Sequence, residues 1–193
     1  MKYILIVIVL VIGAYFLLPD KKIEAPTNNI EGVDIVGEYK VEEDSRIDWR
    51  GAKVVGLSHD GSILISSGEI NNGTGEIVFD VTSITSDSAG LSKHLKSEDF
   101  FDVETYPMAK FYIKSIDAKS ITGDLTIKDV TKEITVPVEV SIDGDMAIKG
   151  ETVIDRTDFG INYDSGSIFK ELGDKAIDDD VNIYFDLKFA KSK

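Results

Sequence analysis

The sequence predicts an all-β fold: an eight-stranded antiparallel barrel with a short helical lid, preceded by an N-terminal hydrophobic helix. Three observations lead to this prediction. From Glu38 onward, apolar and polar residues alternate with a period of two in short segments. Asn-Gly and Asp-Gly dipeptides separate several segments, and such dipeptides favour tight hairpins. A chain of roughly 150 residues can place eight strands in a closed barrel, which removes exposed sheet edges.

Composition narrows the function classes. The 193 residues fit one domain with an appendage. Acidic residues outnumber basic ones 35 to 21, giving a formal charge of −14, and such a surface repels the phosphates of nucleic acid. The absence of cysteine excludes disulfides, thiolate nucleophiles and sulfur metal ligands, and only two histidines remain for acid/base or metal chemistry. We therefore predict no nucleic-acid partner, and a homodimer is compatible with the sequence.

The first segment, residues 1–18, contains one charged side chain, Lys2, followed by an unbroken apolar run from Tyr3 to Leu18. As a helix this run would be about 24 Å long, shorter than a hydrocarbon core of roughly 30 Å. It is therefore intermediate between a signal-peptide core and a short anchor. We predict a signal anchor, with a cleaved signal peptide as the alternative. Residues 19–37 lack periodicity and predict a linker to the domain at 38–190.

The strands follow in order through the domain. The alternating segments lie at residues 45–50, 63–65, 76–81, 110–114, 125–127, 134–142, 146–154 and 181–189. Three dipeptides predict hairpin turns: Asp60-Gly61, Asn72-Gly73 and Asp143-Gly144. Because proline cannot donate to a ladder, Pro137 predicts an edge, a bulge or a strand end.

One region interrupts the alternation. Residues 88–101 have helical spacing of apolar side chains and follow Ser86 and Asp87, which are candidate N-caps. We predict a short helix and turn that cover one mouth of the barrel. An eight-stranded barrel is wide enough to be filled by its own side chains or to hold one small ligand. Alternation alone leaves both possibilities open.

Candidate catalytic and metal-binding groups are sparse. His59 and His94 are far apart in sequence, so we predict no metal site, with His59 in a turn and His94 in a structural hydrogen bond or a ligand contact. We expect Arg156 to pair with Asp158. The acidic run at 178–180 predicts solvated charge. No Gly-x-Ser-x-Gly or other triad signature is present, so we predict a protein that is not an enzyme and needs no cofactor.

Three stretches in this order and spacing resemble the YceI-like family of extracytoplasmic, lipocalin-like barrels. They are His94-Leu95-Lys96-Ser97-Glu98-Asp99-Phe100-Phe101-Asp102 with Tyr106-Pro107, then Gly123-Asp124-Leu125-Thr126-Ile127-Lys128-Asp129-Val130-Thr131-Lys132, then Asp155-Arg156-Thr157-Asp158-Phe159-Gly160. The resemblance covers about residues 39 to 189. It implies that the barrel binds a long amphiphile, such as a polyisoprenoid or an isoprenoid quinone, without catalysis. The alternative is a filled barrel that serves as a surface interaction or structural module.

The resemblance also implies a location and a set of ligand contacts. The location is the outer face of the cytoplasmic membrane if residues 1–18 remain attached, and the periplasm or the medium if they are cleaved. Inward aromatic residues occur in any barrel core, so only the resemblance makes them ligand candidates. The predicted ligand-binding residues are Trp49, Phe79, His94, Phe100, Phe101, Phe111, Leu125, Ile127, Val136, Val138 and Phe185.

Overall fold

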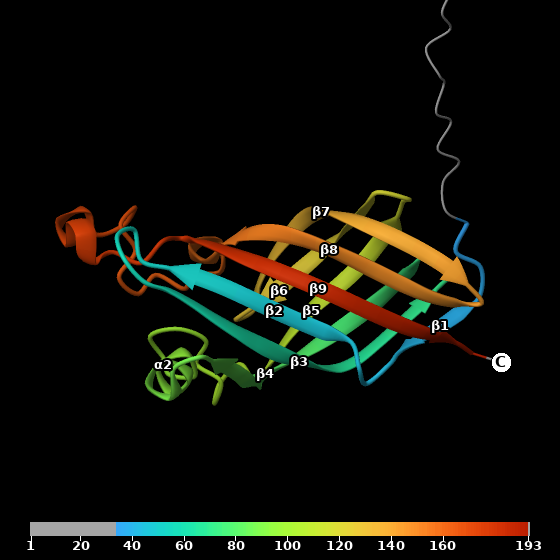
Figure 1. Cartoon of the computed structure of the whole chain (residues 1–193), viewed down its shortest axis with the longest axis horizontal. Coiled ribbons are helices and arrows are strands. Elements are labelled where there is room, and N and C mark those ends of the chain that lie inside the picture. The colour runs from blue at the N-terminus through green and yellow to red at the C-terminus, as the bar shows by residue number, and fades with distance from the viewer. Residues whose placement is uncertain (1–33, 193) are drawn as a thin grey trace, which may run out of the picture. The chain divides into compact units, whose positions relative to one another are not determined.

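The computed structural model describes residues 34–192, which form one antiparallel sheet and a few short helical segments (Figure 1). The elements are β1 (Glu38–Val41), β2 (Arg46–Ala52), β3 (Ser58–Asn71), β4 (Thr74–Ser86), α2 (Ala89–Leu95), β5 (Met108–Ile116), β6 (Ser120–Ile127), β7 (Val130–Asp143), β8 (Asp145–Asp155), two 3-10 segments η1 (Arg156–Phe159) and η2 (Lys170–Lys175), and β9 (Asp180–Lys191).

The sheet closes on itself. Its strand order is β1-β3-β2-β9-β8-β7-β6-β5-β4, and additional pairings join β3 to β4 and β1 to β9. The short strand β1 and the following strand β2 both pair with β3 and β9, so they share one position around the barrel. The nine strands therefore make an eight-stranded closed antiparallel barrel. This confirms the predicted barrel, in which β1 was not foreseen.

The two ends of the barrel differ. One end, here called the base, carries the β3–β4 and β7–β8 hairpins and both ends of the described chain (Figure 1). The other end, here called the mouth, carries the β2–β3 loop, α2 and the long β8–β9 connection with η1 and η2 (Figure 1). Long segments therefore surround the mouth only.

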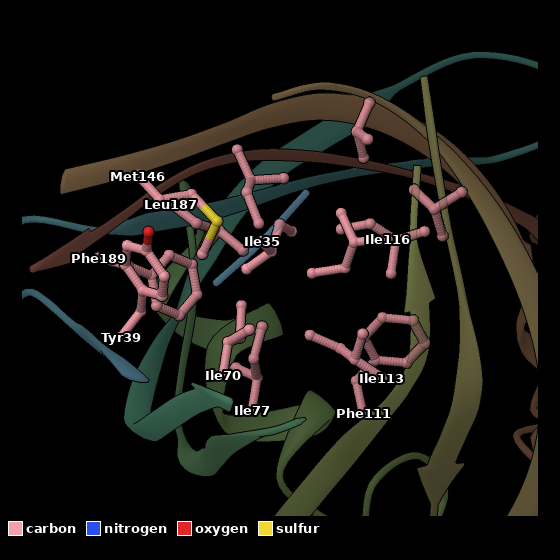
Figure 2. Packing of buried hydrophobic residues seen from close by; sticks show 14 of the residues in the cluster. Ile35, Tyr39, Ile70, Ile77, Phe111, Ile113, Ile116, Met146, Leu187 and Phe189 are labelled. Carbon is pink, nitrogen blue, oxygen red and sulfur yellow. The ribbon is translucent and has the colours of Figure 1, made fainter. Parts of the chain in front are cut away.

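The base is packed solid. Six large side chains, each no more than 2% exposed, fill it, and we call them the base cluster: Tyr39, Ile70, Ile113, Met146, Ile148 and Phe189. Figure 2 shows the rings of Tyr39 and Phe189 beside Met146, with Ile70 below them and Ile113 across the view beside Phe111. Because interiors pack at nearly crystalline density, this cluster closes the barrel at the base.

Two of the three predicted turns are confirmed. Asn72 and Gly73 have φ of 49° and 83° in the β3–β4 hairpin, and Gly144 has φ of 77° between β7 and β8. The two positive φ values at Asn72 and Gly73 are those of a type I′ turn, and Gly144 supplies the positive φ of the β7–β8 turn. The predicted turn at Asp60-Gly61 is wrong, because both residues lie inside β3. Gly61 is needed there for close packing, since a Cβ would lie 2.5 Å from the Trp49 ring.

The predicted helix is present in a shorter form. Ser88 caps α2 by accepting a hydrogen bond from the Leu91 amide at 3.4 Å. The predicted caps Ser86 and Asp87 are wrong, since Ser86 is the last residue of β4 and the Asp87 carboxylate contacts His59. Pro137 lies in the interior of β7 and not at an end of its own strand, so the predicted place is wrong; it lies opposite Ser120, where the neighbouring strand β6 begins.

The domain begins earlier than predicted. Ile35 was assigned to the linker, but it is 6% exposed and belongs to the main core. The predicted hydrophobic helix and membrane segment at residues 1–18 lie outside the described residues. Within residues 34–192, no helix has the length and apolar character needed to cross a bilayer.

Candidate functional site

A cavity of about 500 Å³ occupies the barrel between the base cluster and the mouth. All eight positions around the barrel contribute to its lining, which is almost entirely apolar, and no residue of the base cluster belongs to it. The lining continues to the mouth, where it includes Lys53, Asp164 and Asp178. The cavity is therefore a pocket closed at the base.

The sequence-predicted ligand residues meet in this cavity. All eleven line it: Trp49, Phe79, His94, Phe100, Phe101, Phe111, Leu125, Ile127, Val136, Val138 and Phe185. Six strands, α2 and the turn after α2 bring these side chains together from distant parts of the sequence. That they contact a ligand stays a prediction.

Three aromatic rings of the cavity wall lie over glycines. A Cβ on Gly61, Gly123 or Gly150 would come within 2.5 to 2.8 Å of ring carbons of Trp49, Phe111 or Phe185, respectively. In each pair the glycine and the aromatic residue lie on adjacent strands. The missing Cβ lets the ring approach the strand backbone. The rings therefore lie close to the wall, and this arrangement keeps the lumen wide.

The lid closes part of the mouth. Leu91 and Leu95 of α2 line the cavity, and Leu95 packs in a second core cluster with Ile84, Phe100 and Ile161. A hydrogen bond of 2.7 Å from the Lys128 ammonium to the Phe100 carbonyl ties the turn after α2 to the β6–β7 hairpin. The lid is thus attached to two sides of the barrel.

His94 holds the lid against the β8–β9 connection. Its ring meets Phe100 and Tyr163 edge to face, with centroids 5.0 and 4.8 Å apart, and its Nε2 lies 2.9 Å from an Asp99 carboxylate oxygen. Edge-to-face contacts and the hydrogen bond together fix the imidazole. This agrees with the structural hydrogen bond predicted for His94, although the partner is a carboxylate.

Arg156 organises the opposite side of the mouth. Its buried guanidinium donates to the carbonyl oxygens of Ile161, Tyr163, Ile177 and Asp178, and to the Asp179 carboxylate at 3.0 Å. Burial lowers the pKa of Arg156, while the charge of Asp179 opposes that shift. Five donors in a rigid fork suit such a convergence of acceptors.

The predicted Arg156–Asp158 pair is wrong. Asp158 lies 3.0 Å from the Lys132 ammonium instead, because η1 directs it toward the outside of β7. The acidic run was predicted to be solvated, and Asp179 departs from that prediction. Its side chain is 17% exposed and also accepts hydrogen bonds from Ser165 and Ser167. Asp179 and Arg156 therefore form the polar centre of the β8–β9 connection.

His59 was predicted in a turn, but it lies in β3 at the cavity rim. Its Nδ1 is 2.7 Å from Asp87, and this hydrogen bond is the main reason why the pKa of Asp87 falls below its ordinary value. On the same rim Arg50 donates two hydrogen bonds to Asp60 and lowers the pKa of that carboxyl. The His59–Asp87 pair connects the β2–β3 hairpin to the start of the lid, and the Arg50–Asp60 pair joins the two strands of that hairpin.

Sequence reasoning missed the contribution of the β8–β9 connection. Ile161, Tyr163 and Ile177 line the cavity, although their segment has no regular periodicity. Ile161 and Tyr163 are separated by one residue, as on one face of an extended segment. This spacing is the one local signal in the sequence that their side chains point to the same side. Among residues 34–192 no group of three or more His, Asp or Glu side chains is placed to hold a metal ion.

A closed antiparallel barrel with one deep apolar pocket, a lid and a packed base is the architecture of a small-molecule-binding barrel. A family model described as the YceI-like domain matches residues 39–189. The chain belongs to the YceI-like family, as its sequence motifs predicted.

Two curated relatives illustrate the sequence similarity. A UPF0312 protein of Shewanella denitrificans is 31% identical over 119 residues, which cover 55% of this chain and 62% of that protein. A UPF0312 protein of Pseudomonas putida is 30% identical over 159 residues, which cover 67% of this chain and 79% of that protein. The match thus spans less than two thirds of the Shewanella protein.

Two solved structures share the fold. A polyisoprenoid binding domain from Saccharophagus degradans superposes with a TM-score of 0.67 at 14% identity, covering 82% of this chain and 100% of that one. BcnA of Burkholderia cenocepacia superposes with a TM-score of 0.58 at 23% identity, covering 77% and 98%. At these identities the similarity establishes the barrel architecture.

Proposed function

We propose that the barrel binds and sequesters the long apolar chain of an amphiphilic lipid, such as a polyisoprenoid or an isoprenoid quinone. The apolar cavity of about 500 Å³ carries this proposal, since ligand sites typically measure about 300 to 1,000 Å³. The fold shared with a polyisoprenoid binding domain supports the same class of ligand. A cavity of this size also favours a carrier over a filled structural barrel.

Desolvation of the chain supplies the binding energy. Each buried methylene contributes about 0.8 kcal/mol, so ten buried carbons contribute roughly 8 kcal/mol before the entropy of ordering is subtracted. Three of the polar groups near the mouth make structural contacts: Arg156 with Asp179, His59 with Asp87, and His94 with Asp99. Apart from these, the lining offers few polar side chains, such as Lys53 and Asp164, to a headgroup. Selectivity therefore follows chain length and shape, and the proposal includes no catalytic step.

The proposed location is the outer face of the cytoplasmic membrane, with residues 3–18 as the anchor. This proposal rests on the unbroken apolar run in the sequence, which matches the pattern of a signal-peptide cleavage site only loosely. Fractionation of expressing cells, with determination of the mature N-terminus, tests this. A protein in the soluble fraction that starts near Tyr15 or later would refute the anchor and favour a periplasmic or secreted carrier.

The ligand itself is tested with the full chain purified from its own host. Native mass spectrometry and organic extraction identify what the protein carries, and Phe111→Trp narrows the lumen. Phe111 is 9% exposed and lines the cavity, whereas the next residue, Tyr112, is 51% exposed on the outer face of β5. Tyr112→Trp is therefore the matched control.

In a carrier, Phe111→Trp should shorten the bound chain, or lower its occupancy about tenfold, with little change in stability. The control variant should carry the same lipid as the wild type. In a filled barrel, the same change should overpack the core and reduce stability by roughly 1 to 3 kcal/mol. An empty extract combined with that loss of stability would replace the carrier with an interaction or structural module.

A further inference from the structure

Large apolar side chains are exposed on two loops at the mouth. Of the twelve large hydrophobic residues that are exposed within residues 34–192, five lie here: Val54, Val55, Leu57, Ile168 and Phe169. Their exposure ranges from 42% for Phe169 to 71% for Leu57. We call these five residues the mouth tip. Exposed apolar side chains gathered in one place commonly mark an interaction surface.

The two loops of the mouth tip are joined to one another. The Val54 amide donates to the Ala176 carbonyl at 3.0 Å, and an isolated bridge pairs Lys53 with Ile177. A second bridge pairs Ile177 with Ser165, and the Phe169 amide donates to the Ser165 carbonyl at 2.8 Å. The β2–β3 loop and the β8–β9 connection project together from this end of the barrel (Figure 1).

The mouth tip continues into the cavity. Ala52 and Lys53, which lead into the first loop, line the cavity, and so do Ile177 and Asp178, which follow the second loop. An apolar chain leaving the cavity between these loops would pass from buried apolar wall to exposed apolar side chains. Such a path reduces the apolar surface of the chain that contacts water, and exposing each methylene to water is unfavourable.

The charge on the first loop also differs from the rest of the protein. Residues 51–59 contain Lys53 and no carboxylate, in a chain with a formal charge of −14. On the second loop Lys170 directly follows Phe169 and Lys175 lies further along, together with the carboxylates of Asp164, Glu171 and Asp174. Apolar side chains beside lysines suit the interface of a bilayer that contains anionic lipids, where an acidic surface is repelled.

We propose that the mouth tip docks into the surface of a lipid bilayer, where the barrel takes up or delivers its ligand. This inference rests on the proposed lipid-binding function and adds its site of exchange. Residues 19–33 can span at most about 50 Å when extended. The 14-residue strand β3 is about 46 Å long at 3.3 Å per residue. An anchor at residues 3–18 and the mouth tip can therefore reach the same membrane.

Insertion is measured on the full chain in proteoliposomes of phosphatidylcholine and phosphatidylglycerol that contain spin-labelled lipid. Because the chain has no cysteine, Leu57→Cys provides a single site for a fluorophore. The matched control is Ile142→Cys, since Ile142 is 38% exposed beside the β7–β8 hairpin at the base. We expect the label at position 57 to be quenched and the label at position 142 to be unaffected. Equal quenching at both positions would overturn the proposal.

Function is measured as transfer of a long-chain polyprenol from the same vesicles. The double variant Leu57→Asp with Phe169→Asp should slow transfer by about tenfold or more, since two apolar anchors are lost. Its polyprenol binding from detergent micelles should equal that of the wild type, because neither residue lines the cavity. Unchanged transfer would overturn the docking proposal.

The outcomes separate this inference from the function on which it rests. If the wild type takes up no polyprenol from micelles or vesicles, the proposed ligand class fails, while the quenching experiment still reports whether the tip inserts. If Leu57→Cys instead forms disulfide-linked dimers without quenching by lipid, the mouth tip contacts a second copy of the chain and the bilayer proposal is refuted.

Discussion

The glycine-supported rings of the cavity wall lead to a quantitative prediction for Gly150→Ala. A Cβ at this position would lie 2.5 Å from the Pro137 carbonyl oxygen and 2.6 Å from Cζ of Phe185. An ordinary contact is about 3.4 Å or longer, so both groups must move by roughly 0.8 to 0.9 Å. The phenylalanine ring can move into the lumen, but the Pro137 carbonyl belongs to the backbone of β7.

Overpacking of this kind costs about 1 to 3 kcal/mol, and the backbone contact places Gly150→Ala in the upper half of that range. For a domain of this size, a loss of about 2 to 3 kcal/mol lowers Tm by roughly 4 to 12 °C. Urea denaturation and thermal unfolding measure the loss. The ring displaced into the lumen should also shorten the extracted lipid chain, as detected by mass spectrometry.

Two further variants make the reasoning refutable. Gly90→Ala is the matched control, because its Cβ would meet nothing closer than Ser88 Oγ at 3.9 Å and alanine favours α2. Phe185→Leu removes the ring, so the double variant with Gly150→Ala should be about 1 kcal/mol more stable than the two single effects predict. Strict additivity, or a Gly150→Ala protein as stable as the control, would show that the ring does not rest on Gly150.

Three further predictions concern the β8–β9 connection, the core and pH. Arg156→Leu leaves buried acceptors unpaired and should cost about 3 to 5 kcal/mol in urea denaturation, with only partial recovery in Arg156→Lys; wild-type stability in the leucine variant would contradict this. Ile35→Ala should cost about 2 to 4 kcal/mol, and no change in the unfolding midpoint would place Ile35 outside the core. Because His59 lowers the pKa of Asp87 below its ordinary 3.8, their contact stabilises the fold above that pH and is lost as pH falls through the lower folded-state pKa. Asp87→Asn should therefore reduce the acid sensitivity of Tm below about pH 4, and a titration identical to wild type would refute the role of this pair.

The barrel could be predicted because alternation determines which face of each strand is buried. Val136 and Val138, for example, are separated by one residue and both line the cavity. Asn72-Gly73 and Asp143-Gly144 were informative for the same local reason, since the turn type depends on their own φ values. Eight of the eleven predicted ligand residues could be placed in the barrel interior from the faces of their strands, and His94, Phe100 and Phe101 belong to a family motif.

The errors arose where one local pattern has two physical causes. Asp60-Gly61 has the composition of a turn, yet Gly61 is required by the Trp49 ring on the neighbouring strand. Arg156 has an acidic neighbour at Asp158, but its partner Asp179 lies 23 residues further along the chain. Long-range partners of this kind depend on how an irregular connection folds, and its sequence has no periodicity from which to read them.

The size of the cavity argues for a bound ligand over a structural role. The apolar walls of a cavity of about 500 Å³ lack the packing partners that a filled core would give them. The base cluster demonstrates that this barrel can be filled by side chains such as Tyr39, Met146 and Phe189. Toward the mouth the same barrel instead has glycines beneath Trp49, Phe111 and Phe185, which hold the rings near the wall. A structural module gains nothing from replacing core volume with glycine at these positions, whereas a carrier needs the space they leave.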